Sequence, residues 1–466
     1  MPKRDRIVFV GAGGAGLTAA FHVARRSPDA QITVFSKDPV VAYSQCGMPF
    51  VLDRQIDGFD RLIIYGPEVF RDLGLDVRTG TPVRAIDLDG KAVVTEAGER
   101  VAYDRLVIGT GSRPFVPPVP GASQPGVTTL FTLEDGRRLG ERLRQAKDVV
   151  IVGGGPIGLE TAPAFLGAGA RLTIIERVPQ LMPSALDPDM AALVQEHLEK
   201  KGARVITGRG VDAINGRDAV ESVSCAGETI PADLVLLSAG VRPETGLARR
   251  AGIETGVTGG IVVDEYFRVR RAGQVLDDVL AAGDCAEVKG LITGKPVIYA
   301  VGSVANRQAA YVGDYLVGKP RPYPPVLCPA ICVIGGLHVG SVGLNTHACG
   351  QAGIAPVTFK AKGWTRARYY PGGKTVEIKL LADRSPSGGE RLVGGQVIGE
   401  ENVHGKINVL SLAMEKRMTP ADLAAAETCY APPVSPMIDP LTYAAEMLAL
   451  KCARAKSRGG IDGRSK

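Results

Sequence analysis

The stretch RIVFVGAGGAGLTAAFHVARR, residues 6–26, decides the fold that we expect for this chain. It reads as a strand, a glycine-rich turn and a helix. Gly11, Gly13 and Gly16 meet the G-x-G-x-x-G spacing. The first glycine permits the tight turn, the second lets a pyrophosphate approach the backbone, and the third lets the helix pack closely on the strand. The N-terminus of the helix then offers unpaired N–H groups to the phosphates. Alone, the motif also fits a turn of purely structural purpose.

The same glycine-rich device occurs twice in the chain, which favours a functional role. The stretch VVIVGGGPIGLETAPAFLGAGARLTIIER, residues 149–177, repeats the spacing with Gly153, Gly155 and Gly158. Glu160, on the expected helix, is a further candidate for cofactor contact. Two such units predict two dinucleotide sites in one chain. They suggest that one cofactor passes electrons to the other.

The residue at the end of the second strand distinguishes the two copies. In the second copy it is Glu176, whose carboxylate can accept hydrogen bonds from ribose hydroxyls and repels a 2′-phosphate. We therefore expect NADH as the reductant, with NADPH possible because Arg177 adjoins the acid. In the first copy this position is Ser36, and Asp38 lies close behind it. We still place Ser36 at the first cofactor site, although it departs from the usual acid.

Three further apolar stretches end in turns of small residues. They are YDRLVIGTGSRP at 103–114, ADLVLLSAGVRPETG at 232–246 and VLDDVLAAGDCAEV at 275–288. The first two resemble the crossings between the FAD and NAD domains of two-dinucleotide flavoproteins, and the third resembles their second FAD motif. This resemblance implies cofactor contacts from Thr110, Gly111 and Gly240. It also implies that Asp284 holds the ribityl chain of FAD.

The length and composition limit the classes of protein to which the chain can belong. A chain of 466 residues predicts about two to four domains. The net charge is only +6, and no basic run is interleaved with aromatic residues, so we expect no nucleic-acid binding. The eight cysteines form no C-x-x-C pair, and no histidine lies at zinc-finger spacing. We therefore expect reduced thiols in a cytoplasmic protein without a metal site.

One apolar stretch tests the expectation that no membrane is involved. VLCPAICVIGGLHVGSVGL, residues 326–344, has no charge unless His338 is protonated, and its length matches a short membrane span. Pro329, four glycines and short bursts of β-branched residues favour buried strands. We expect no membrane segment, and a spanning helix is the alternative.

The stretch AYSQCGMPF, residues 42–50, contains one cysteine without a partner nearby. It resembles the motif of the single-cysteine coenzyme A-disulfide reductases, Ser-(Phe/Tyr)-x-Asn-Cys-x-x-Pro-Tyr, whose sisters are NADH oxidases and NADH peroxidases. Tyr43, Cys46 and Pro49 match this motif. The residues that depart from it are Ala42, Gln45 and Phe50. The resemblance covers about residues 5–450 of the chain.

The resemblance explains why one cysteine is enough. If the substrate provides the second thiol, Cys46 alternates between a thiolate and a mixed disulfide with coenzyme A, or else a sulfenic acid. Cys46 is expected to begin a helix beside the flavin, where the helix dipole favours the thiolate. The alternative is a small thiol buried in the core.

Two stretches near the C-terminus also resemble this family. They are ARYYPGGKTVEIKL at 367–380 and DLAAAETCYAPPVSPMIDPL at 422–441. In the coenzyme A-disulfide reductases, tyrosines of the other subunit act as the acid, and the resemblance assigns this role to Tyr430 and to Tyr369 or Tyr370. The related oxidases and peroxidases carry a histidine in the first glycine turn, where this chain has Gly14. Interface packing is the alternative for the tyrosines.

A coenzyme A substrate needs cations for its phosphates. The family places a phosphate-binding arginine at the position of Arg25, Arg26 follows it, and Arg71 lies near a further basic position. A solvated helix end is the alternative for the arginine pair. Ser44 and Gln45, beside the cysteine, complete the expected substrate contacts.

We therefore expect an α/β protein with two Rossmann-like, glutathione reductase-like dinucleotide-binding domains and a C-terminal α/β dimerisation domain, which works as a homodimer. The expected ranges are 1–117 and 245–325 for the FAD domain, 118–244 for the NAD(P) domain, 326–452 for the dimerisation domain and 453–466 for a disordered tail.

The expected activity is FAD-dependent reduction of coenzyme A disulfide, or of a related disulfide or persulfide, by NADH. An NADH oxidase or a polysulfide reductase is the first alternative. The second is a redox-sensing or electron-delivering module that needs flavin but no thiol substrate. Cys429, which precedes Tyr430, is a further thiol whose role stays open.

Overall fold

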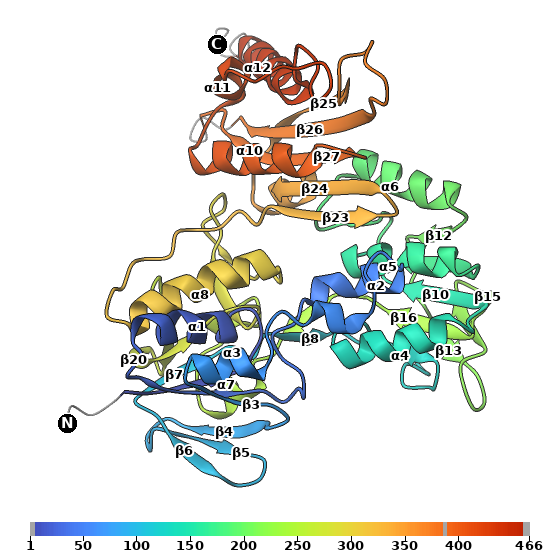
Figure 1. The fold of residues 1–466 in the computed structure, drawn as a ribbon. Helices are drawn as coiled ribbons and strands as arrows, with labels where there is room; N and C mark the ends of the chain where they lie inside the picture. The colour runs from blue at the N-terminus through green and yellow to red at the C-terminus, as the bar shows by residue number, and fades with distance from the viewer. Residues whose placement is uncertain (1–4, 385–388, 460–466) are drawn as a thin grey trace, which may run out of the picture. The chain divides into compact units, whose positions relative to one another are not determined.

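The chain folds into two units, shown in Figure 1 as a computed structural model that describes residues 5–384 and 389–459. The first unit comprises Met1–Phe115, Leu130–Gly140 and Gly240–Val326, and the second comprises Val116–Thr129, Glu141–Ala239 and Leu327–Lys466. Most of the expected NAD(P) range and all but the first residue of the expected dimerisation range fall in the second unit, whereas Leu130–Gly140 and residues 240–244 belong to the first. The division into three domains therefore stays a prediction.

The first unit is built on a six-stranded sheet in the order β19-β20-β7-β1-β2-β3. All neighbours are parallel except β19 and β20. The strands are β1 (Arg6–Val10), β2 (Gln31–Phe35), β3 (Leu75–Arg78), β7 (Arg105–Ile108), β19 (Arg268–Arg271) and β20 (Gln274–Ala281). The glycine-rich turn after β1 thus lies at the carboxyl edge of a parallel sheet, where such folds bind nucleotides.

Both faces of this sheet are covered, because alternate residues of each strand point to opposite sides. Ile7 and Phe9 of β1 pack with helices α1 (Gly16–Arg26) and α8 (Gly302–Leu316). Val8 and Val10 pack toward the small antiparallel sheet on the other side. That sheet is formed by β4 (Val83–Asp87), β5 (Ala92–Thr95) and β6 (Arg100–Ala102).

The second unit contains a parallel five-stranded sheet in the order β12-β11-β10-β16-β9. Its strands are β9 (Val127–Thr128), β10 (Asp148–Val152), β11 (Arg171–Glu176), β12 (Arg204–Thr207) and β16 (Leu234–Leu237). Helices α5 (Pro156–Gly167) and α6 (Pro188–Lys200) pack on β11 and β12 respectively. Strand, glycine turn and helix therefore follow each other as the sequence predicts.

The C-terminal part of the second unit is an antiparallel sheet in the order β23-β24-β27-β26-β25. Its strands are β23 (Ala330–Ile334), β24 (Leu337–Gly343), β25 (Pro356–Trp364), β26 (Thr375–Asp383) and β27 (Leu392–Gly399). Helix α10 (Val403–Glu415) packs on β24 and β27, and α12 (Pro440–Gly459) packs on β25 and β26. Shorter helices are α9 (Thr346–Gln351) and α11 (Pro420–Ala425).

The apolar stretch 326–344 contains strands β23 and β24, so the expectation of strands is confirmed. In the described part of the chain, no helix is long and apolar enough to cross a membrane. The range expected for the tail begins inside α12, which runs to residue 459, and the disorder of the tail stays a prediction. Residues 460–466 lie outside the described residues.

Candidate functional site

The first glycine turn has the geometry of a phosphate cradle. Gly11 has a φ of 114°, and a Cβ there would lie 2.0 Å from the carbonyl oxygen of Gly109. A Cβ at Gly16 would lie 2.0 Å from the carbonyl oxygen of Gly11. At Gly13, by contrast, a Cβ would meet nothing within 4 Å. The first and third glycines are needed for close backbone packing, and the second borders open space, which fits an approaching pyrophosphate.

Asp284 lies beside this turn in the same unit. The amide of Gly283 donates to the side-chain oxygen of the buried Gln308 at 2.6 Å, which joins this loop to α8. The hydroxyl of Ser112 donates to Oδ2 of Asp284 at 2.8 Å. Burial raises the pKa of Asp284, and the hydrogen bond from Ser112 partly offsets this. A half-buried carboxylate that accepts a hydrogen bond from one hydroxyl also suits hydroxyl donors of a ligand.

The predicted crossing turns hold two antiparallel strands together, β8 (Ser112–Pro114) and β17 (Val241–Pro243). The hydroxyl of Thr110 donates to the carbonyl of Glu244 at 2.5 Å, and the amide of Glu244 donates to Gly111 at 2.8 Å. Gly111 and Gly240 adopt φ values of 67° and 94°. The side chain of Thr110 and the backbones of Gly111 and Gly240 therefore take part in this crossing.

Ser36 directly follows β2, as the alignment of the two copies predicts. Its hydroxyl accepts a hydrogen bond from the amide of Asp38 at 3.1 Å, and the residue is buried. Ser36 therefore shapes the turn after β2. Its contact with a cofactor ribose stays a prediction.

Cys46 is exposed and lies in a short, firmly held loop. It occupies a single 3-10 turn, η1 (Gln45–Gly47), which leads directly into α2 (Met48–Leu52). Tyr43 accepts a hydrogen bond from the amide of Leu133 at 3.3 Å, and the Gln45 side chain donates to the carbonyl of Phe131 at 3.1 Å. Residues 131–133 precede α4 (Leu133–Leu143) or begin it, and no sequence motif identified them as part of the site.

The three predicted phosphate-binding arginines have different surroundings. Arg26, at the end of α1, pairs with Asp314 at 3.0 Å and lies 3.0 Å from Nδ1 of His22. Arg25 and Arg71 are exposed, Arg71 near the end of α3 (Pro67–Asp72), and no ion pair joins either to another described residue. Arg26 is thus occupied by a structural ion pair, and Arg25 and Arg71 are the stronger candidates.

The second glycine turn repeats the geometry of the first. Gly153 has a φ of 112°, and a Cβ there would lie 2.5 Å from the carbonyl oxygen of Ser238. A Cβ at Gly158 would lie 2.4 Å from the Ser238 hydroxyl, whereas at Gly155 the nearest atom would be 3.9 Å away. Again the second glycine faces the open side of the turn.

Glu176 and Glu160 have separate roles around this turn. The Glu176 carboxylate accepts hydrogen bonds from the amides of Gly154 and Val178, at 2.7 Å and 2.8 Å. Glu160, on α5, accepts one from the amide of Val333 in the edge strand β23 at 2.9 Å. Burial raises the pKa of Glu160 to about 7. Glu160 therefore joins α5 to the C-terminal sheet, and its predicted cofactor contact stays a prediction.

The structure brings two of the three predicted tyrosines together. The hydroxyls of Tyr369 and Tyr430 lie 3.0 Å apart, and the side chains are 76% and 42% exposed. This hydrogen bond raises the pKa of Tyr430. The two loops also meet through the amide of Ala367, which donates to the carbonyl of Pro432 at 3.2 Å. Of the two residues that the sequence left open, Tyr369 is the one that contacts Tyr430.

Two dinucleotide-type glycine turns and an exposed lone cysteine define a two-cofactor redox protein. Residues 5–313 match the family described as pyridine nucleotide-disulphide oxidoreductase, and residues 329–441 match the dimerisation domain of that family. The chain belongs to the pyridine nucleotide-disulphide oxidoreductase family. The family uses FAD with NAD(P)H, so the predicted fold, the class of enzyme and the cofactors are confirmed at this level.

Several characterised proteins are similar to the chain over nearly its whole length. An NADH oxidase of Methanocaldococcus jannaschii is 37% identical, over 95% of this chain and 98% of its own. A CoA-dependent NAD(P)H sulfur oxidoreductase of Pyrococcus abyssi is 32% identical, over 96% and 98%. The solved structure of an NAD-dependent persulfide reductase from A. fulgidus has a TM-score of 0.91 and 35% identity, over 96% of this chain and 83% of that one.

Proposed function

We propose that this enzyme uses NADH to reduce coenzyme A disulfide, or a related low-molecular-weight disulfide or persulfide, through Cys46. The observation that carries the proposal is the exposed Cys46 in a loop that two side-chain hydrogen bonds hold in place. The persulfide reductase and the CoA-dependent sulfur oxidoreductase among its relatives support this class of acceptor.

The residues of the two glycine turns fit the two cofactors. FAD would be held by the first turn and by Asp284, with Thr110, Gly111 and Ser36 nearby. NADH would be held by the second turn, with Glu176 toward the ribose. When bound, FAD accepts the two electrons of NADH and makes them available to thiol chemistry.

Cys46 would act as the nucleophile toward the disulfide. Its thiolate forms a bond to one sulfur of the substrate and the substrate S–S bond breaks, which gives a mixed disulfide and one coenzyme A thiolate. Two electrons then break the mixed disulfide, so that Cys46 returns as a thiolate and the second coenzyme A leaves. Each departing thiolate takes up one proton. The reaction therefore consumes one NADH and one proton from solution and yields two thiols and NAD⁺.

Tyr430 of the partner subunit is the proposed proton donor. In its own chain Tyr430 is exposed and bound to Tyr369, so it is available to a second subunit. Its raised pKa keeps the hydroxyl protonated at neutral pH. We propose a homodimer for this reason, and the dimerisation-domain match supports it. A donor held at hydrogen-bond distance contributes about 10²–10⁴-fold to such a step.

The substrate would be held by side chains around Cys46. Gln45 and Ser44 flank the thiol, and the exposed Arg25 and Arg71 would bind the phosphates of coenzyme A. The eight cysteines form no C-x-x-C pair in the sequence, which fits a reducing compartment, so we propose a cytoplasmic enzyme.

An NADH oxidase is the second candidate, because the relative from Methanocaldococcus jannaschii bears that name. Steady NADH consumption in air without any disulfide would favour it. Flavin reduction without turnover of any small acceptor would instead favour an electron-delivering module.

The decisive experiment is mass spectrometry of the purified protein without reductant, followed by kinetics with coenzyme A disulfide, persulfide and oxygen. We expect a coenzyme A adduct on Cys46 and faster turnover with a sulfur acceptor than with oxygen. An unmodified Cys46 together with turnover by oxygen alone would refute the proposal.

A further inference from the structure

Residues 177–187, which we call the strap, connect strand β11 to helix α6 and are anchored at both ends. At one end the strap packs on the second glycine turn. The amide of Met182 donates to the carbonyl of Gly154 at 2.9 Å, and the amide of Gly154 donates to Glu176 at 2.7 Å. A Cβ at Gly154 would lie 2.6 Å from Cδ2 of the buried Leu181. The conformation of the turn is therefore tied to that of the strap.

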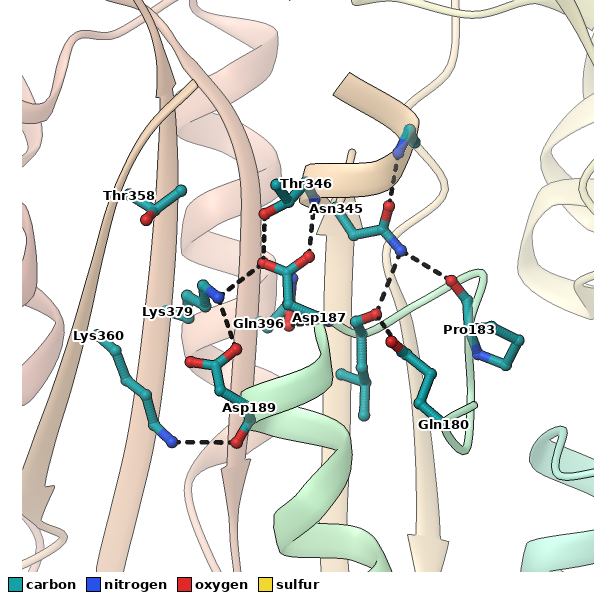
Figure 2. A network of polar contacts seen from close by, with 12 residues as sticks. Gln180, Pro183, Asp187, Asp189, Asn345, Thr346, Thr358, Lys360, Lys379 and Gln396 are labelled. Atoms are coloured by element: carbon teal, nitrogen blue, oxygen red, sulfur yellow. Dashed lines mark hydrogen bonds and ion pairs between the residues drawn. The ribbon is translucent and has the colours of Figure 1, made fainter. Parts of the chain in front are cut away.

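The other end of the strap is held by the C-terminal sheet and by α9 (Figure 2). The buried side chain of Asn345 donates to the carbonyls of Pro183 and Leu186, at 2.9 Å and 3.3 Å. Its oxygen also accepts from the amide of Ala348, as the N-cap of α9. The Asn345 side chain thus caps the N-terminus of α9 and fixes the strap.

Asp187, the last residue of the strap, is the centre of this anchor (Figure 2). It is only 2% exposed. Its carboxylate accepts two hydrogen bonds from Thr346, from the amide at 2.7 Å and from the hydroxyl at 2.8 Å, and it lies 2.9 Å from the Lys379 ammonium. Its amide donates to Gln396 at 2.8 Å. Lys379 belongs to β26 and Gln396 to β27, so the strap ends on two strands of the C-terminal sheet.

The arrangement of Asp187 differs from that of an ordinary helix cap. Asp187 is the N-cap of α6, where an aspartate normally accepts a hydrogen bond from an amide of the first turn. Here the side chain makes no such bond. Because a buried ion pair adds little net stability over apolar packing, stability alone does not explain the pair. Holding the strap in one position is the role that we assign to the pair.

Both groups are charged at neutral pH. Burial acts to raise the pKa of Asp187, but the Lys379 ammonium and the hydrogen bonds from Thr346 hold it below its usual value. Burial acts to lower the pKa of Lys379, but Asp189 and Asp187 hold it above its usual value. Asp189 lies 2.6 Å from the same ammonium. The ion pair therefore stays charged at neutral pH.

We propose that Lys379 is a positioning residue for the nicotinamide dinucleotide: through Asp187 it holds the strap against the second glycine turn. The inference rests on the assignment of this turn to NADH under the proposed function. It makes the affinity for the reductant depend on a side chain of the C-terminal sheet, in the range that matches the dimerisation domain. Cys46 belongs to the first unit and the strap to the second, so we expect the disulfide site not to respond.

The test compares charge removal with charge-preserving exchange. Lys379→Met leaves the Asp187 carboxylate buried without its cation, which can impair folding. The double variant Asp187→Asn/Lys379→Gln removes both charges and keeps hydrogen-bonding groups of similar size. Lys379→Arg keeps the charge. Dissociation constants for NAD⁺ are measured by titration calorimetry on the FAD-loaded enzyme, together with KM for NADH and for coenzyme A disulfide.

We expect the neutral pair to weaken NAD⁺ binding by about tenfold, with kcat and the disulfide KM within about twofold of the wild type. Lys379→Arg should keep most of the wild-type affinity for NAD⁺. Hydrogen exchange at the Met182 amide should become faster in the neutral pair, because that amide reports closure of the strap on the turn. Lys360→Met is the matched control: Lys360 lies on β25 and contacts the carbonyl of Asp189 at 3.2 Å, beyond the strap. It should leave the NAD⁺ affinity unchanged.

Two outcomes overturn the inference. One is a folded neutral pair that binds NAD⁺ as tightly as the wild type. The other is a rise in the KM for coenzyme A disulfide that equals the rise in the dissociation constant for NAD⁺. Such an equal rise would indicate general destabilisation. A wild-type enzyme that binds no NAD⁺ would refute the assignment of the site itself, so the two failures are distinguishable.

Discussion

The hydroxyls of Tyr369 and Tyr430 lie 3.0 Å apart although 61 residues separate them in the chain. Tyr369 belongs to the connection between β25 and β26, and Tyr430 to the connection between α11 and α12. The base of the first loop is fixed by Glu401, which accepts hydrogen bonds from Thr365 and from Arg366, the latter at 2.9 Å. These contacts anchor the base of the loop that carries Tyr369. The exposed hydroxyls of Tyr369 and Tyr430 can therefore act as one hydrogen-bonded unit.

Tyr430→Phe should slow disulfide turnover by about 10²-fold or more, because it removes the proton donor, and flavin reduction by NADH should stay intact. Tyr369→Phe should have a smaller effect and a diagnostic pH profile. Since the hydrogen bond to Tyr369 raises the pKa of Tyr430, its loss should move the alkaline limb of kcat to lower pH. Stopped-flow flavin reduction and steady-state pH profiles measure both effects.

Tyr443→Phe, an exposed tyrosine of α12, is the control for these variants and should behave as the wild type. A larger defect in disulfide turnover in Tyr370→Phe than in Tyr369→Phe would show that Tyr370, and not Tyr369, assists Tyr430. If the alkaline limb of the kcat profile does not move in Tyr369→Phe, the hydrogen bond between the two tyrosines does not control the proton donor.

Glu160 should make the stability of the protein depend on pH. Its pKa is raised from 4.5 to about 7 because the carboxyl group is buried. The neutral acid is thus favoured in the folded state. Its contribution to stability is fully present below pH 4.5 and is lost as the pH rises through about 7. The shift corresponds to at most about 3 kcal/mol.

Glu160→Gln removes this titration and keeps an oxygen that can accept from Val333. The apparent Tm of the variant, relative to the wild type at equal protein concentration, should therefore rise between pH 5 and pH 8. Glu199→Gln, on the exposed side of α6, should give a constant offset. Parallel pH curves for Glu160→Gln and the wild type would contradict the assignment.

Glu176 should determine the preference for NADH over NADPH. Like charges about 4 Å apart repel by about 4 kcal/mol at an effective dielectric constant of 20, so a carboxylate at the ribose opposes a 2′-phosphate strongly. Glu176→Ala should narrow the ratio of kcat/KM for NADH to that for NADPH by tenfold or more, about 1.4 kcal/mol. Because Glu176 also holds the Gly154 and Val178 amides, KM for NADH should rise as well.

The exposed Glu228, which pairs with Arg204, provides a charge-matched control in the same unit. Glu228→Gln should leave the preference unchanged. A wild type that uses NADPH as well as NADH would show that Arg177 outweighs the acid.

The glycine turns could be predicted from the sequence because each requirement is local. A positive φ or a backbone contact at Gly11 and Gly153 excludes other residues within a stretch of a few positions. The strands beside them follow from short apolar runs. The same holds for Ser36, whose position after β2 could be counted, although its own hydrogen bond to Asp38 could not.

Contacts between distant segments could not be predicted. The loop of Cys46 is held by Phe131 and Leu133, which are 86 and 90 residues away from their partners. Arg25 and Arg26 look alike in the sequence, and only Asp314, 288 residues after Arg26, distinguishes them. No periodicity or spacing rule connects such positions, because the tertiary fold alone brings them together.

Cys46 and Tyr430 should act together from different subunits of the dimer. Cys46→Ser should abolish disulfide reduction, because an alcohol cannot form the mixed disulfide, and NADH should still reduce the flavin. Tyr430→Phe keeps the thiol and lacks only the donor, and its defect should shrink for leaving thiols of low pKa. If Tyr430 acts in the partner subunit, a heterodimer of the two variants has one site with both wild-type residues. Heterodimers purified with two different affinity tags should therefore regain up to about half of the wild-type activity per dimer. Wild-type turnover in Cys46→Ser would refute the role of the thiol, whereas verified heterodimers without any recovery would refute only the donation between subunits.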